Sequence, residues 1–308
     1  MDGRLIIRPA RPEDRPAVER ICAHTWEWGD YILEVWDAWL ADERAVLQVG
    51  EMNGQVVAVN RLVFHSPDQV WFEGMRVDPE RRRQGIGWQF MEHDLAYARE
   101  CGAKVVRLAT GHSNTAVHNM VARVGMVRIG AGQLLTAEAM PGGPLPAILR
   151  PEQAAQVTAF LQRSSVLDHT HGLYDAGWVW QTLSAERVAE MLAAGQMAAL
   201  LTREEELAAL AAVLVNPEGG GVWVGYADAD ASRAEAVTAL ATALRAHAAR
   251  LGYPQIEAML PDLAWLRDAF RAAGYDQGDW KGELWIFERR LDKDVADRKA
   301  PSRDGQNG

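Results

Sequence analysis

Apolar and polar residues follow two different spacings along this chain, and each spacing predicts a type of element. Residues 70–77 (VWFEGMRV) and 105–110 (VVRLAT) are short, mainly apolar runs, which is typical of buried strands. Between them, apolar residues recur at helical spacing: Trp88, Met91, Leu95 and Ala98. The pattern therefore predicts a strand, a turn, a helix and a second strand, in this order.

The same order of elements returns in the second half of the chain. Residues 222–260 again start with Val-Trp and read as a strand, a turn, a helix, a glycine and a strand. In both halves a further helix then ends at a glycine, Gly125 in one and Gly274 in the other. Upstream, residues 23–43 and 168–186 each hold a tryptophan-rich segment that we expect to be helical. Alternating helices and strands predict two tandem α/β domains, each built around a mixed sheet.

A break in the pattern indicates where the two domains meet. Residues 141–146 (PGGPLP) are rich in proline and glycine, as a linker would be. The sequence therefore predicts a first domain at 1–140, a linker at 141–146 and a second domain at 147–291. Residues 292–308 have almost no apolar content and are expected to form a disordered tail.

Composition narrows the class of protein. The chain has 308 residues, 48% hydrophobic and 24% charged, and its net charge of −10 argues against general binding to nucleic acids or anionic membranes. The sequence shows no apolar run long enough to span a bilayer and no signal-peptide layout. It has two cysteines, too few for a disulfide framework or a metal site. We expect a cytoplasmic protein without a metal. An acidic surface suits a cationic substrate such as an amine, although its commoner role is to keep a protein in solution.

The turn before the predicted helix concentrates positive charge in an otherwise acidic chain. Residues 81–83 are all arginine and stand just before Gly85 and Gly87. Glycine lets a ligand approach the backbone, and the helix start and the arginines both favour an anion. We expect a pyrophosphate there; the alternative is an ordinary glycine turn. A dinucleotide fingerprint is excluded because Phe90 replaces its third glycine, and the Gly-Lys-Ser/Thr ending of a P-loop is missing.

Residues 82–87 (RRQGIG) resemble the R/Q-x-x-G-x-G/A signature of the GNAT acetyltransferase superfamily. The surroundings are similar too: a Val-Asp-Pro strand exit precedes the signature, and Asn114 and Gly125 follow the next strand. The resemblance covers residues 4–135 and implies a central mixed, mainly antiparallel sheet flanked by helices, with acetyl-CoA at this turn. The implied cofactor contacts are Met75, Arg76, Val77, Arg82, Arg83, Gln84, Gly85, Ile86, Gly87, Trp88 and Asn114.

The second half departs from this signature. Asp228 and Asp230 take the place of the arginines, and no glycine pair follows. Like charges oppose a pyrophosphate. We therefore interpret residues 147–291 as a degenerate GNAT-like repeat without a cofactor, which packs on the first domain and helps to shape the substrate pocket.

Glu73 is the carboxylate inside the apolar strand 70–77. Acetyl transfer from a thioester to an amine needs a base for the amine and a donor for the oxyanion. Partial burial raises the pKa of a glutamate, so Glu73 is the candidate general base, a role that an acid on this strand often has in the family. Alternatively, Glu73 faces solvent or pairs with an arginine. Gly74 suits either a bulge that frees an N–H near Met75 for the acetyl carbonyl, or packing against a bulky neighbour.

The general acid that is usual in the family is absent. It is a tyrosine seven residues after the asparagine, and here that position is Val121. His118 lies one helical turn earlier and is the candidate substitute; the alternative is a histidine that faces solvent. Asn114 either binds cofactor or water, or simply caps the helix. The thiolate can also leave without a dedicated acid, because thiols are far more acidic than alcohols.

The first helices of a GNAT domain usually wall the acceptor site. In this chain that segment supplies Trp28, Asp30 and Tyr31, since aromatic faces and a carboxylate attract cations. Trp36 and Trp39 fit a helical core stripe instead. The segment faintly resembles the GNAT group that includes a vertebrate free-histidine acetyltransferase, which points to an amino-acid-like acceptor.

These observations predict an acetyl-CoA-dependent N-acetyltransferase acting on a small-molecule amine, as a monomer or a homodimer. One alternative is a non-catalytic acyl-CoA-binding sensor or interaction protein, which the absence of a tyrosine at position 121 suggests. The other is an enzyme similar to mycothiol synthase, which also carries two repeats but works through its C-terminal one. The acceptor amine and the length of the acyl chain are left open.

Overall fold

The structure is a computed structural model that describes residues 4–23, 25, 29–216, 221–229, 234–278 and 281–292. These residues form two compact units. Unit 1 draws its described residues from Met1–Leu108, Ala116–Val127 and Phe287–Gly308, and unit 2 from Ala109–Thr115 and Arg128–Ile286. The predicted disordered tail, apart from Asp292, lies outside the described residues.

The compact units divide the chain differently from the predicted domains. Residues 141–146 contain no helix or strand, as expected of a segment rich in proline and glycine, but they lie inside unit 2. Each unit also contains a strand from the other half of the sequence. Nearly all of β6 (Val127–Glu138) belongs to unit 2, and the last residues of β14 (Leu284–Arg290) belong to unit 1. The predicted boundaries at 1–140 and 147–291 thus mark the two copies of the sequence repeat and not the two compact units. As domain boundaries they stay a prediction.

Unit 1 contains a mixed, mainly antiparallel sheet. Its strands follow the order β1-β2-β3-β4-β5, in which the first four are antiparallel neighbours and β5 runs parallel to β4. The final residues of β14 join this unit, where Glu288 pairs with Arg107 of β5 at 2.8 Å. The strands are β1 (Ile6–Pro9), β2 (Ala45–Met52), β3 (Gln55–Ser66), β4 (Gln69–Val77) and β5 (Val105–Gly111).

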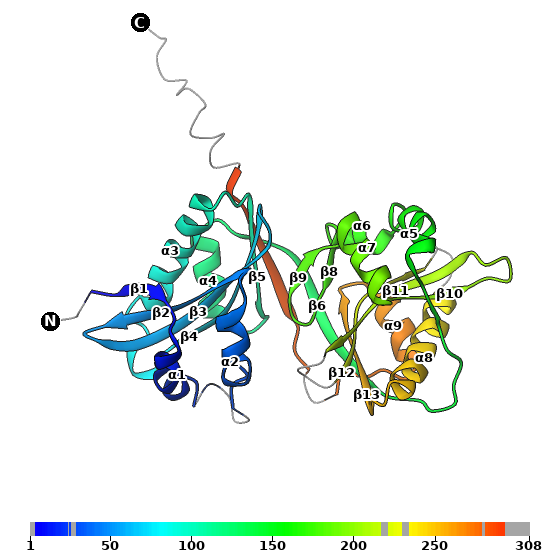
Figure 1. The fold of residues 1–308 in the computed structure, drawn as a ribbon, viewed down its shortest axis with the longest axis horizontal. Coiled ribbons are helices and arrows are strands. Elements are labelled where there is room, and N and C mark those ends of the chain that lie inside the picture. Colours follow the sequence, from blue (N-terminus) through cyan, green and yellow to red (C-terminus); the bar gives the residue numbers. More distant parts are fainter. Residues whose placement is uncertain are drawn as a thin grey trace, which may run out of the picture. The chain divides into compact units, whose positions relative to one another are not determined.

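Helices cover both faces of the unit 1 sheet. On β3, Val56 and Val59 pack with the apolar side chains of α1 and α2, whereas Val57 and Ala58 pack with the start of α3. Figure 1 shows α1 and α2 on one side of these strands and α3 on the other. The helix expected after the glycine turn is therefore confirmed, as is the fold class. The helices are α1 (Arg15–Cys22), α2 (Ile32–Ala41), α3 (Ile86–Glu100) and α4 (Thr115–Arg123).

Unit 2 repeats the plan around a second sheet. Its strands follow the order β6-β13-β12-β11-β10-β7, in which only the β12–β13 pair is parallel among the described pairs. The strands are β7 (Ala147–Ile148), β8 (Leu173–Asp175), β9 (Trp180–Thr182), β10 (Met197–Leu201), β11 (Leu207–Asn216), β12 (Gly221–Ala229) and β13 (Gln255–Pro261), besides β6.

The helices of unit 2 pack on this second sheet around one continuous apolar core. Figure 1 shows α5, α6 and α7 on one side of the strands and α8 and α9 on the other. Within the described parts of the chain, no helix has both the length and the apolarity needed to cross a membrane. The helices are α5 (Ala154–Leu161), α6 (Ser165–His169), α7 (Ala185–Ala194), α8 (Ala234–Arg250) and α9 (Ala264–Ala272).

The second tryptophan-rich segment, 168–186, differs from the helical prediction. Its centre is a hairpin, in which β8 and β9 pair as an antiparallel two-stranded sheet. Gly177 and Trp178 have φ values of +87° and +67°, and Oδ1 of Asp175 accepts the N–H groups of both, at 2.9 and 3.2 Å. A carboxylate that fixes two left-handed residues favours a tight turn over a helix. The first such segment, 23–43, contains α2 as predicted.

Candidate active site

The arginine-rich turn follows β4 directly and leads into α3. A short 3-10 turn, Pro79–Arg81, is followed by the exposed residues Arg82, Arg83 and Gln84. Gly85 then has a left-handed φ of +79° and precedes α3 without a side-chain cap. A helix start that lacks a capping side chain leaves its first N–H groups available to a ligand.

Open space surrounds this helix start. Among the described atoms, a Cβ at Gly85 would meet none within 4 Å, and one at Gly87 would meet the sulfur of Met120 at 3.9 Å. Arg123 of α4 adds a cation, because its guanidinium lies 3.9 Å from the ring centroid of Trp88. Free amides, room and positive charge are what a pyrophosphate needs, so these residues fit coenzyme A. Arg123 was missed from the sequence, although a basic residue in the last turn of α4 was a usable signal.

The other predicted cofactor contacts flank this turn or lie in unit 2. Met75 and Val77 pack against the cluster that contains Ile86, whose side chain is buried, so Ile86 can offer a ligand only its backbone. Asn114 belongs to unit 2 and is exposed, and its Nδ2 donates to Oγ1 of Thr110 at 3.0 Å. The contacts of these residues with a cofactor stay predictions.

A bulge interrupts β4 beside Glu73. The pairing between β3 and β4 shifts between Glu73 and Arg76, and Gly74 between them has a φ of +68°. A Cβ at Gly74 would lie 2.8 Å from Cζ3 of Trp39. The structure therefore contains both features that the sequence left as alternatives, a bulge and a bulky neighbour against the glycine.

Glu73 is held by a buried arginine. Its Oε1 accepts a hydrogen bond from Nη1 of Arg61 at 2.5 Å, and Nη2 of the same arginine donates to Oδ2 of Asp42 at 2.5 Å. The side chains of Glu73 and Arg61 are 14% and 9% exposed. Burial raises the pKa of Glu73, and the guanidinium opposes this shift. A raised pKa is the direction that a base working near neutrality needs.

Arg61 was not predicted, although a signal for it exists in the sequence. It interrupts the apolar run of β3 (QVVAVNRLVFHS), just as Glu73 interrupts the run of β4. Adjacent antiparallel strands place such residues opposite each other, and Arg61 indeed pairs with Glu73 in the register of β3 and β4. Two charged residues of opposite sign, each interrupting an apolar run of its strand, therefore indicated a buried ion pair.

Asp30 is engaged within the protein. Its side chain is fully buried, and its Oδ2 accepts a hydrogen bond from Nε of Arg76 at 2.6 Å. Its Oδ1 accepts the N–H of Ile32 at 3.2 Å. The expectation that Asp30 offers its carboxylate to an acceptor amine does not agree with this geometry, because the carboxylate fixes Arg76 and the start of α2 instead. Arg76, a predicted cofactor contact, accordingly points its side chain toward Asp30.

Tyr31 is the predicted acceptor residue that remains accessible. It is 43% exposed, its ring meets that of Trp39 edge-on at 5.8 Å, and the guanidinium of Arg76 lies 5.6 Å from its centroid. Trp28 lies outside the described residues. Trp36 is fully buried in the core beneath α2, as its helical spacing predicted. Tyr31 and Trp39 thus form an aromatic wall beside the Arg61–Glu73 pair, since Arg61 lies 4.7 Å from the Trp39 ring.

His118 lies on α4 without facing solvent. It is half-buried, and its ring centroid is 5.6 Å from that of Phe287. Val121, at the position of the usual tyrosine, is buried. The solvent-facing alternative for His118 is therefore wrong, whereas its role as a general acid stays a prediction.

In unit 2 the chain itself fills the corresponding bulge. The pairing of β11 and β12 shifts beside Gly225, and a Cβ there would lie 1.6 Å from the backbone oxygen of Asp175. Asp175 is 1% exposed, and its Oδ1 accepts from Nε1 of Trp223 at 2.6 Å. Burial raises the pKa of Asp175 to about 7. The hairpin β8–β9 therefore occupies the place beside this bulge.

Asp228 does not present its charge on an exposed loop, because its carboxylate holds the start of α6. It is buried, and its Oδ2 accepts from Oγ of Ser164 at 2.5 Å and from the N–H of Val166 at 3.3 Å, at the start of α6. Asp230 lies outside the described residues. The sequence predicts that Asp228 and Asp230 repel a pyrophosphate. For Asp228, this repulsion would have to come from a carboxylate that is buried and hydrogen-bonded inside unit 2.

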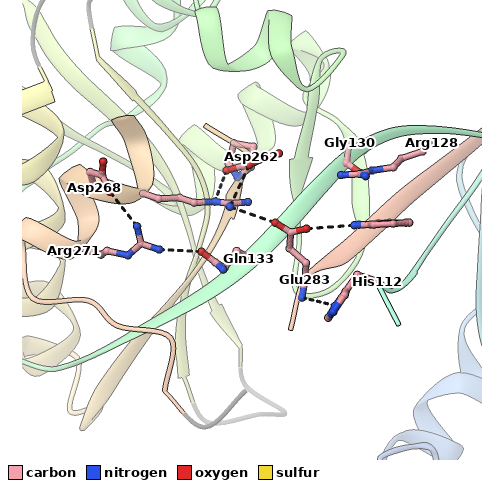
Figure 2. Close-up of polar contacts among 11 residues, drawn as sticks. His112, Arg128, Gly130, Gln133, Asp262, Asp268, Arg271 and Glu283 are labelled. Atoms are coloured by element: carbon pink, nitrogen blue, oxygen red, sulfur yellow. Dashed lines mark hydrogen bonds and ion pairs between the residues drawn. The ribbon is translucent and has the colours of Figure 1, made fainter. Parts of the chain in front are cut away.

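A polar network in unit 2 surrounds Glu283 (Figure 2). Its carboxylate accepts from Nη1 of Arg267 at 3.4 Å and from Nε1 of Trp285 at 3.3 Å, and its backbone N–H donates to Nδ1 of His112 at 3.3 Å. Arg267 stands seven positions before Gly274, as His118 stands seven before Gly125. The repeat position of His118 thus carries a buried arginine in an ion-pair network.

Comparisons with known proteins agree with this geometry. The acetyltransferase (GNAT) family model matches residues 15–126, which include the bulge and the arginine-glycine turn. These residues form a GNAT acetyltransferase domain. No curated protein matches the chain in sequence. The chain therefore contains an N-acetyltransferase domain of the GNAT family.

Solved structures extend the likeness of fold to both units. A GCN5-related N-acetyltransferase from Sphaerobacter thermophilus is similar with a TM-score of 0.65 and 16% identity, over 93% of this chain and 95% of that one. A tandem GNAT protein from the clavulanic acid biosynthesis pathway, solved without AcCoA, gives 0.58 and 16%, over 93% and 98%. A GCN5-related N-acetyltransferase from Kribbella flavida gives 0.50 and 16%, over 96% and 73%. The fold is therefore shared with these three proteins, one of which is a tandem GNAT protein.

Proposed function

We propose that the protein transfers an acetyl group from acetyl-CoA to the amine of a small molecule, with Glu73 of unit 1 as the general base. The observation that carries this proposal is the position of Glu73. It is a buried carboxylate with a raised pKa, beside a strand bulge, on the strand that leads into the arginine-glycine turn. On the corresponding strand of unit 2, Val224 precedes the bulge glycine, and the carboxylate beside Gly225 is that of Asp175, whose Oδ1 already accepts from Gly177, Trp178 and Trp223.

Each group has a distinct task in this proposal. Acetyl-CoA, when bound, supplies the activated thioester. Arg82, Arg83 and the first N–H groups of α3 hold its pyrophosphate. The carboxylate of Glu73 takes the proton of the attacking amine, directly or through water, and the N–H of Met75 at the bulge meets the acetyl oxygen. His118 is the candidate donor for the departing sulfur.

The acceptor wall favours a cationic amine that carries an aromatic or amino-acid-like group. Around Glu73 the charges balance, with three carboxylates (Asp30, Asp42 and Glu73) against three arginines (Arg44, Arg61 and Arg76), so the preference for a cation rests on the aromatic faces. The exposed ring of Tyr31 offers a face to a cation or to a flat side chain. We expect a monomer or a homodimer, with no partner required for chemistry.

An amine panel with labelled acetyl-CoA tests the proposal, starting with free amino acids, polyamines and aminoglycosides. Glu73→Gln should lower kcat/KM by about 10²–10⁴-fold, which is the usual contribution of a general base, while coenzyme A binding by calorimetry stays unchanged. Glu288→Gln is the matched control, because Glu288 is also a half-buried glutamate of unit 1 in an ion pair with arginine.

Three results would contradict parts of the proposal. Turnover by Glu73→Gln equal to that of the wild type would remove Glu73 from the mechanism. Tight coenzyme A binding with no transfer to any amine of the panel would favour an acyl-CoA-binding sensor. Loss of coenzyme A binding in variants of unit 2 alone would move the cofactor site away from the arginine-glycine turn.

A further inference from the structure

Arg61 stands between two carboxylates that differ in their surroundings. Its Nη1 reaches Glu73 and its Nη2 reaches Asp42, each at 2.5 Å. Its guanidinium lies 4.7 Å from the ring centroid of Trp39, the residue that also covers Gly74 at the bulge. One buried guanidinium thus contacts the base candidate, a second carboxylate and the aromatic side chain that packs on the bulge.

The two carboxylates respond to this environment in opposite directions. The pKa of Glu73 is raised, mainly by burial. The pKa of Asp42 is lowered, because burial is outweighed by the N–H of Arg44 and by the charges of Arg44 and Arg61. Asp42 therefore stays ionised over the range in which Glu73 takes up a proton.

We infer that Arg61 is a positioning residue for Glu73, and that Asp42 balances its charge so that Glu73 remains able to accept a proton. This inference rests on the proposed function, in which Glu73 is the base. If Glu73 were the sole partner of the guanidinium, the cation would lower the pKa of Glu73 so far that the carboxylate would be a weak base. A guanidinium shared with a permanently charged Asp42 orients Glu73 and still lets it titrate.

Glu73 has several charged or titratable neighbours, which set the sign of each expected effect. Arg61 from β3 lowers its pKa, and Asp42 after α2 raises it. Trp71 of β4 donates a hydrogen bond that lowers it. Tyr31, at the start of α2, is near enough for its own pKa to be influenced by Glu73. Loss of the cation should therefore raise the pKa of Glu73, and loss of the Asp42 charge should lower it.

The test is the acid limb of the pH profile of kcat/KM for the full-length enzyme with its best amine. Arg61→Met should move this limb upward by about one pH unit or more, because an opposite charge at this distance lowers a carboxyl pKa by roughly 1–3 units. At pH values on the acid side of the wild-type limb this shift corresponds to about a tenfold loss of kcat/KM, which rising pH restores. Arg61→Lys should return the limb most of the way, and Asp42→Asn should move it downward.

Arg8 provides the matched control, because it too bridges two carboxylates in unit 1. It pairs with Asp14 at 2.8 Å and with Glu51 at 3.0 Å. Arg8→Met should lower thermal stability without moving the acid limb. If Arg61→Met does not fold, the downward shift in Asp42→Asn decides the question, with Arg61→Lys close to the wild-type limb as its reference, since both variants keep the buried site polar.

The outcomes separate this inference from the proposed function. An inactive Glu73→Gln together with an unmoved acid limb in the Arg61 and Asp42 variants would overturn the role of Arg61 and leave Glu73 as the base. A fully active Glu73→Gln would instead overturn the proposed base, whatever the Arg61 variants do. Shifts of the same sign in Arg61→Met and Asp42→Asn would contradict the charge-balancing role of Asp42.

Discussion

The bulged strands β4 and β12 carry the same Val-Trp pair at their second and third positions, and each has a glycine at its bulge, but what lies against each glycine differs. At Gly74 the neighbour is the side chain of Trp39, which can shift, and the preceding residue is Glu73. At Gly225 the neighbour is the backbone oxygen of Asp175, in a hairpin fixed by its own carboxylate. One bulge borders a charged, aromatic site, whereas the other is filled by the chain.

The difference shows how one plan supports a reaction in one unit and a core in the other. Unit 1 keeps an exposed arginine-glycine turn beyond its bulged strand, while Asp228 at the end of β12 is buried and caps α6. A strand bulge is therefore a shared structural device, and the chemistry depends on what surrounds it. The following variants test this view, in order of decreasing effect.

The largest effect is expected when arginines in the turn of unit 1 are replaced by aspartates, the residues that unit 2 has in the corresponding segment. Arg82→Asp combined with Arg83→Asp should weaken coenzyme A binding by a factor of about 100 or more, because two attractive charges at a phosphate site become repulsive. Calorimetry at two salt concentrations measures this, and the loss should shrink as salt rises. Arg163→Asp with Arg203→Asp, two exposed arginines of unit 2, is the control for net charge. Equal weakening in both pairs would contradict a localised phosphate site.

Next in size is the response of the two bulge glycines to a methyl group. Gly225→Ala should destabilise the protein by about 2–4 kcal/mol, because the new Cβ would lie 1.6 Å from a backbone atom that has no alternative rotamer. Gly74→Ala should cost about 1–2 kcal/mol from its left-handed φ, since Trp39 can yield. Urea unfolding compares the two variants. A larger cost at Gly74 would mean that the hairpin in unit 2 is looser than its contacts indicate.

The sequence predicted most of the elements because local patterns determine them. The strand at 70–77, the helix that the glycine turn opens and the second repeat follow from periodicity and from glycine positions, and the structure contains all three. The hairpin within 168–186 could not be predicted in the same way. Its turn depends on the carboxylate of Asp175 binding two backbone N–H groups and on burial against β12, and these contacts appear only in the folded chain.

The candidate site shows the same division. The turn at 82–87 and the choice of Glu73 as a candidate follow from residue types that are unusual in their context. The sequence left open whether Glu73 faces solvent or pairs with an arginine, and in the structure it pairs with Arg61. Arg61 requires the register of β3 with β4, and the burial of Asp30 requires Arg76 to fold back upon it. Neither arrangement is encoded at a fixed sequence spacing. Partners from different elements, 12 residues apart for Arg61 and Glu73 and 46 for Asp30 and Arg76, are therefore the part that sequence reasoning missed.

A smaller effect, on the pH dependence of stability, is expected from Asp175→Asn. The pKa of Asp175 is raised by burial to about 7, whereas that of an unfolded aspartate is about 4. Between these values the folded state binds more protons than the unfolded state, so stability should fall as pH rises, by about 1 kcal/mol per pH unit. Asn is neutral at every pH and should remove this slope.

Unfolding in urea from pH 4 to pH 8 measures this slope. Asp14→Asn is a control of opposite sign, because Arg8 lowers the pKa of Asp14 and its contribution is lost as pH falls. The same slope in the wild type and in Asp175→Asn would mean that water reaches the hairpin and that Asp175 is ionised in the folded protein. The filled bulge of unit 2 would then be less tightly closed than its contacts with Gly225 indicate.

The smallest effect is expected at the repeat position shared by His118 and Arg267. His118→Phe keeps a ring against Phe287 but removes the titratable group, and kcat should fall by no more than about tenfold, because a thiolate can leave without a dedicated acid. Arg267→Met should instead lower stability and leave kcat unchanged, since Arg267 pairs with Glu283 and Asp262 inside unit 2. A pH profile of kcat with thermal unfolding distinguishes the two. If His118→Phe lowers kcat by more than a hundredfold and removes the alkaline limb, then α4 supplies an essential acid in place of the tyrosine, and the repeat position is catalytic in one unit and structural in the other.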